Sequence, residues 1–169
     1  MEEPDFEKAL EERDIRSILG EMRRRPHQVE VQQAASDALF RAVQHHPATA
    51  KEAVQSGAFE DLSRAIMSNT GHRDLCTDAA TALWRLCREG GFAAAQAAVK
   101  QGCFDALKCI LDCHPEGSAP NEAALLALGC LADHGMVSFG SKQQVQDLQQ
   151  KKHKGKAIAQ IRIVPEEGF

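Results

Sequence analysis

The chain contains no tyrosine and a single tryptophan, and aromatic residues make up only 5% of its 169 residues. Strands prefer aromatic and β-branched side chains, so this shortage favours helices that pack through Ala, Leu, Val and Ile. No apolar run approaches the roughly 18 residues that a membrane span needs. The net charge of −4 gives no overall attraction to nucleic acid or to anionic membranes.

The first residues, Met-Glu-Glu-Pro-Asp, lack the basic-then-apolar order of a secretory signal. Six cysteines lie in apolar periodic segments, and we interpret them as reduced thiols that act as small core residues. A zinc site is the weaker alternative, because no close CxxC or HxxxH pair is present. We therefore expect a protein of the cytosol, or alternatively of the nucleus, without metal or cofactor. The cysteines are Cys76, Cys87, Cys103, Cys109, Cys113 and Cys130.

A sequence pattern recurs at intervals of 44 or 45 residues. Residues 54–62, Val-Gln-Ser-Gly-Ala-Phe-Glu-Asp-Leu, return at 99–107 as Val-Lys-Gln-Gly-Cys-Phe-Asp-Ala-Leu. A second stretch, 79–87, has counterparts at 34–42 and at 124–132. Self-similarity at one period indicates stacked repeats, each of which buries its apolar face against a neighbour.

Each repeat is predicted to consist of helices. Asp14 is a suitable N-cap for a helix with apolar residues at i, i+3, i+4 and i+7, and Pro26 ends that helix. A longer helix is expected over residues 29–45. Short Ala-rich helices end at Gly57 and Gly102, which can adopt the left-handed conformation of a helix terminus. The unit is therefore a short helix, a glycine turn, a middle helix, a loop and a long helix.

This order of helices resembles the armadillo repeat. The resemblance is carried by the glycine turns at 57–59 and 102–104 and by the motif Ala-Ala-x-Ala-Leu-x-x-Leu, which residues 79–86 match best. It covers about residues 10–135, with a period slightly longer than the usual armadillo unit and closer to the related HEAT class. The resemblance implies an all-α, right-handed α-α superhelix of about three repeats. It also implies a scaffold or adaptor, not an enzyme, that binds a peptide or domain along its concave face.

Three segments follow from this interpretation. We expect an acidic N-terminal segment at 1–9, armadillo-like repeats at 10–135, and a C-terminal segment at 136–169 with a short helix at 142–150 and a flexible basic tail. The opposite charges of the two ends are interpreted as those of two solvated segments, and head-to-tail self-association through uncapped repeat ends is the alternative. Residues 157–164 alternate like a strand but have no expected sheet to join.

The long helix of armadillo proteins lines the binding groove, and peptide binders of the family often carry Asn there. The corresponding positions here are Arg41, Arg85 and Cys130, so the resemblance does not extend to importin-like capture of basic peptides. Two arginines in adjacent repeats, with Arg73 and Arg88 near them, would suit an acidic partner. The alternative is that these arginines only cover helix faces.

Trp84 stands beside Arg85 and is the remaining residue predicted to bind a partner. An exposed tryptophan would anchor a partner protein. A buried one would belong to the core between repeats, as its counterpart Phe40 suggests, and this core interpretation is the favoured one.

The C-terminal segment carries a basic run without interleaved aromatic residues. We interpret the run as a solvated linker. A nucleic-acid-associated or nuclear transport-related module is the alternative function. No phosphate loop, dinucleotide fingerprint or nucleophile elbow is present, so no catalytic residue is predicted. The lysines of the run are Lys151, Lys152, Lys154 and Lys156.

Overall fold

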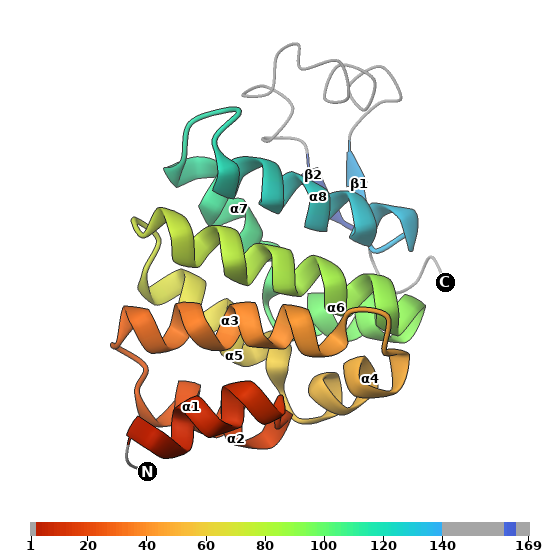
Figure 1. Cartoon of the computed structure of the whole chain (residues 1–169). Coiled ribbons are helices and arrows are strands. Elements are labelled where there is room, and N and C mark those ends of the chain that lie inside the picture. The colour runs from red at the N-terminus through yellow and green to blue at the C-terminus, as the bar shows by residue number, and fades with distance from the viewer. Residues whose placement is uncertain (1–2, 140–160, 165–169) are drawn as a thin grey trace.

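The computed structural model describes residues 3–139 and 161–164. Within these residues the chain forms eight helices and one short pair of strands, which confirms the all-α class as the main architecture (Figure 1). The basic tail and the helix predicted at 142–150 lie outside the described residues. The elements are α1 (Glu3–Glu12), α2 (Ile15–Arg24), α3 (Val29–Val43), α4 (Pro47–Gln55), α5 (Ala58–Ser68), α6 (Arg73–Lys100), α7 (Cys103–Cys113), α8 (Ala119–Asp133), β1 (Val137–Phe139) and β2 (Ile161–Ile163).

The helices form three triplets of short, middle and long helix. Helices α1, α2 and α3 form the first triplet, and α4, α5 and the first part of α6 form the second. The helical conformation of α6 is interrupted at Gly91, where φ is 65° and ψ is −151°. Its second part, α7 and α8 therefore form the third triplet. Gly57 and Gly102 precede α5 and α7 with φ of 90° and 86°, which confirms the two predicted glycine turns.

Equivalent helices of the three triplets lie side by side. The long helices α3, α6 and α8 follow one another in chain order, and the middle helices α2, α5 and α7 do the same (Figure 1). The long helices contribute Leu39, Leu83 and Leu128 to the core, each with 0–1% of its surface exposed. These three leucines are 44 or 45 residues apart, so the sequence period is the period of packing.

Helix α1 crosses the boundary that we expected at residue 10. From Phe6 onward, Glu7, Lys8, Glu11 and Glu12 are exposed, whereas Phe6 and Ala9 are buried at the helical spacing i, i+3. The expected acidic segment at 1–9 thus supplies part of the core and forms most of the short helix of the first triplet.

The strand-like sequence near residue 161 has a partner within the chain, so the expectation that it has no sheet to join is wrong. β2 pairs with β1 in antiparallel register, with Val137 opposite Ile163. Val137 is buried, and the Val164 N–H donates a hydrogen bond to the Met136 carbonyl at 3.0 Å. β1 follows α8 directly, so the strand pair extends the far end of the stack.

Arg23 joins the first triplet to the second. From α2 its guanidinium pairs with the Asp61 carboxylate on α5 at 2.7 Å, and it also donates to the Ser56 carbonyl at the end of α4. Asp61 is only 3% exposed, and Arg64 pairs with it from the same helix at 3.1 Å. Because a buried carboxylate without a partner is strongly destabilising, these arginines are needed where Asp61 lies.

We expect Gly57→Ala to destabilise the protein more than Gly102→Ala. Both changes place a β-carbon on a residue with positive φ, which costs about 1–2 kcal/mol. A Cβ at position 57 would also lie 2.9 Å from the Arg23 Nη2 atom, whereas a Cβ at position 102 would meet no atom within 4 Å. Urea denaturation of both variants measures the difference. Equal losses would show that Arg23 moves aside without cost.

Candidate partner-binding surface

The long helices bring equivalent residues of the three triplets into rows. The first row consists of the residues directly after the three buried leucines, which are two aromatic residues and a glycine. The second row consists of the residues one position further on, which are two arginines and a cysteine. We call the exposed and half-buried residues around these rows the long-helix surface. The rows are Phe40, Trp84 and Gly129, and Arg41, Arg85 and Cys130.

Arg85 lies between α3 and α6 and is only 9% exposed. Its guanidinium carbon is 5.1 Å from the centre of the Phe40 ring and 4.5 Å from the centre of the Trp84 ring. Its Nη1 atom pairs with the Glu89 carboxylate at 3.3 Å. Desolvated cation–π contacts of this kind contribute on the order of 2 kcal/mol. Arg85 therefore stabilises the contact between two triplets, and Glu89 balances its charge there.

Trp84 combines both roles that the sequence left open. It is half-buried and packs against the core, as expected for a residue between repeats. Its ring is also covered by Arg88, whose guanidinium carbon lies 5.4 Å from the ring centre and whose side chain is exposed. The structure thus brings Trp84, Arg85 and Arg88 together on one stretch of α6.

A depression of about 530 Å³ lies between α6 and α8, next to Trp84. Gly129 lines it at the position where the preceding triplets carry Phe40 and Trp84, and a Cβ on Gly129 would meet no atom within 4 Å. Leu126 also lines the depression, and 49% of its surface is exposed. We did not predict Leu126 or Gly129, although the missing side chain in the Trp84 row was a readable signal. The lining residues are Trp84, Arg88, Leu125, Leu126, Gly129, Cys130, Asp133 and His134.

Two of the predicted arginines lie apart from this cluster. Arg41 is exposed and forms an ion pair with Asp37 at 2.8 Å on its own helix. Arg73 is the first residue of α6, 12 positions before Arg85. At 1.5 Å per residue this separation is about 18 Å along the helix. Arg73 is therefore not brought near Arg85.

A cluster of acidic residues lies along the N-terminal half of α6. Burial raises the pKa of Asp78, the hydrogen bond from Gln33 partly opposes this shift, and the neighbouring Asp37 and Asp74 carboxylates raise the pKa further. Arg41 is close enough to offset part of that repulsion. The long-helix surface therefore carries acidic groups near the start of α6 and the exposed cation Arg88 shortly before the interruption at Gly91.

Metal binding, reactive thiols and membrane spans were the other features to check in the part of the chain that the structure describes. No group of three or more His, Cys, Asp or Glu in residues 3–139 and 161–164 is placed to hold a metal ion. Burial raises the pKa of Cys76 to about 11 and that of Cys103 to about 12, so both thiols stay protonated at neutral pH. No described helix is both long enough and apolar enough to cross a bilayer.

No family model, curated protein or solved structure matches the chain. The long-helix surface is therefore interpreted from its own geometry. That geometry joins a half-buried tryptophan, an exposed leucine and a depression next to an exposed arginine, all within α6 and α8.

We expect Asp78→Asn to make the protein slightly more stable than the wild type at pH 7. The pKa of Asp78 is higher in the folded than in the unfolded chain, so the folded state binds the proton more readily. The charged carboxylate therefore costs stability above the folded pKa, and this cost disappears as the pH falls towards the ordinary range for aspartate. Urea denaturation at pH 4, 5 and 7 measures the effect. An advantage of the variant that grows on acidification would contradict this assignment.

Proposed function

We propose that the chain is a protein–protein interaction scaffold with an armadillo-like, right-handed superhelical arrangement of its three triplets. Three observations support this proposal: the sequence period of 44 or 45, the same order of helices in each triplet, and the side-by-side packing of the long helices in chain order. In this proposal α3, α6 and α8 line the concave face, and the role of that face is binding without catalysis.

The observation that carries the proposal is the depression beside Trp84. Interfaces concentrate their binding energy in aromatic and arginine residues around pockets that become fully desolvated. Here Trp84 and Leu126 supply apolar surface, and Gly129 leaves room for a side chain from the partner. Arg88 and Asp133 lie at the edge, where polar contacts fix orientation at little cost in desolvation.

The same geometry changes which partner we propose. Arg85 is balanced by Glu89, and Arg41 by Asp37, so neither offers a free charge to an acidic ligand. Arg88 is the exposed cation of the depression. We therefore propose a partner segment with an apolar or aromatic side chain that enters the depression and a carboxylate that reaches Arg88.

We expect Leu126→Glu to abolish binding of the partners that use this surface. The change places a charge beside Trp84 in a site that must lose its water on binding. The control is Met67→Glu, because Met67 on α5 is 53% exposed and Leu126 is 49% exposed, so both changes replace an equally exposed apolar residue. Quantitative affinity capture from cell lysate, with the wild type and both variants, measures the difference.

A second variant, Gly129→Phe, tests the depression itself. It places in the third triplet the ring that the first carries at Phe40, and the space around position 129 allows it without a clash at Cβ. The same partners should be lost with Leu126→Glu and Gly129→Phe and kept with Met67→Glu. If every captured protein still binds to both α8 variants, the long-helix surface is not the binding surface.

A further inference from the structure

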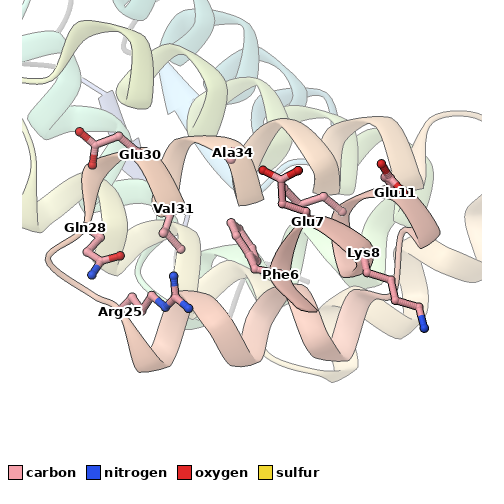
Figure 2. Close-up of a pocket in the computed structure, with 10 residues that line it drawn as sticks. Phe6, Glu7, Lys8, Glu11, Arg25, Gln28, Glu30, Val31 and Ala34 are labelled. Carbon is pink, nitrogen blue, oxygen red and sulfur yellow. The ribbon is translucent and has the colours of Figure 1, made fainter. Parts of the chain in front are cut away.

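A second groove, of about 920 Å³, lies between α1 and α3 at the first end of the stack (Figure 2). Phe6 from α1 and Val31 from α3 supply its apolar floor and are 7% and 8% exposed. Leu10 and Ala34 extend this apolar surface, and both are half-buried. The groove is separate from the depression on α8, because the two lie on opposite end triplets.

The edge of this groove is acidic. Glu7 and Glu11 come from α1 and Glu30 comes from α3, and all three side chains are exposed (Figure 2). No ion pair or hydrogen bond with another described residue occupies any of these three carboxylates. The two cations that line the groove form ion pairs with other carboxylates. Lys8 pairs with Glu12 at 3.8 Å, and Arg25 pairs with the buried Glu21 at 3.1 Å. An apolar floor with an uncompensated acidic edge fits a segment that combines apolar and cationic side chains.

The chain contains such a segment at residues 142–156, where the only acidic residue is Asp147. The segment lies outside the described residues, and in the chain it follows β1 and precedes β2. β1 and β2 pair next to α8, and α1 lies at the other end of the stack (Figure 1). The apolar and cationic residues of the segment are Val145, Leu148, Lys142, Lys151, Lys152, Lys154 and Lys156.

We propose that the α1–α3 groove binds residues 142–156 of a second copy of the chain. Val145 and Leu148 contact the apolar floor, and the lysines lie opposite the three free carboxylates. The groove and the strands that flank the segment lie at opposite ends of the molecule, so the contact is head to tail and each pair of copies keeps one unused groove and one unused segment. Such a contact continues into an open chain of copies unless its rotation closes a ring.

Sedimentation velocity of the full chain over a wide range of protein concentrations tests the proposal. The mass of the wild type should rise with concentration, and the rise should weaken at high salt because the charges of the groove edge are exposed. Reversing two of these charges, Glu7→Lys with Glu11→Lys, should weaken association by about tenfold or more. The matched control is Asp112→Lys with Glu116→Lys, two exposed acids at the end of α7 and just beyond it, and it should associate like the wild type.

Reversing the segment gives a second, independent variant: Lys151→Glu, Lys152→Glu, Lys154→Glu and Lys156→Glu. This variant leaves α1 unchanged. It therefore still tests the proposed contact if the α1 variant loses helicity or melts at a lower temperature. Mixing the two reversed proteins should restore association as pairs, because the intact segment of one meets the intact groove of the other. A wild type that stays monomeric at every concentration overturns the proposal, as does a segment reversal without effect or a mixture that fails to associate.

Discussion

The contact between neighbouring long helices is the constraint on which the structure depends. Leu39, Leu83 and Leu128 are buried because each lies on a helix that is packed against the long helix of an adjacent triplet. No single triplet could bury these positions by itself. The period of 44 or 45 residues therefore determines two things together: which residues form the core, and which residues form rows on the surface of the same helices.

This double use of the long helices explains the position of Arg85. It belongs to the row from which the family resemblance led us to expect ligand contacts, yet its guanidinium lies over Phe40 and Trp84 and makes part of the contact between two triplets. Because the guanidinium of Arg85 is buried in this contact between triplets, its charge is not exposed to a partner. The partner surface that we propose therefore lies one triplet further on, at the depression next to Gly129.

Local sequence was sufficient for the features that are locally determined. Gly57 and Gly102 marked the turns, because a glycine between two apolar periodic stretches is typical of a helix terminus. The burial of Phe6 was not predicted, because the acidic residues around it dominate the composition of α1. The pairing of β1 with β2 was not predicted for a different reason: each strand is three residues long, and a stretch outside the described residues separates them. The environment of Arg85 depends on Phe40, 45 positions earlier, so no inspection of its own helix would have revealed it.

The break at Gly91 has a consequence for the geometry of the whole array. The second and third triplets are joined there without a loop, so the backbone of one residue sets the direction in which the chain passes from one triplet to the next. With φ of 65° and ψ of −151°, that residue lies in a region that is essentially restricted to glycine. Space is not the limit, since a Cβ at position 91 would meet no atom within 4 Å. The direction of this connection is thus fixed by the main chain of one residue, whereas the packing of α6 against α8 and of α5 against α7 depends on side chains.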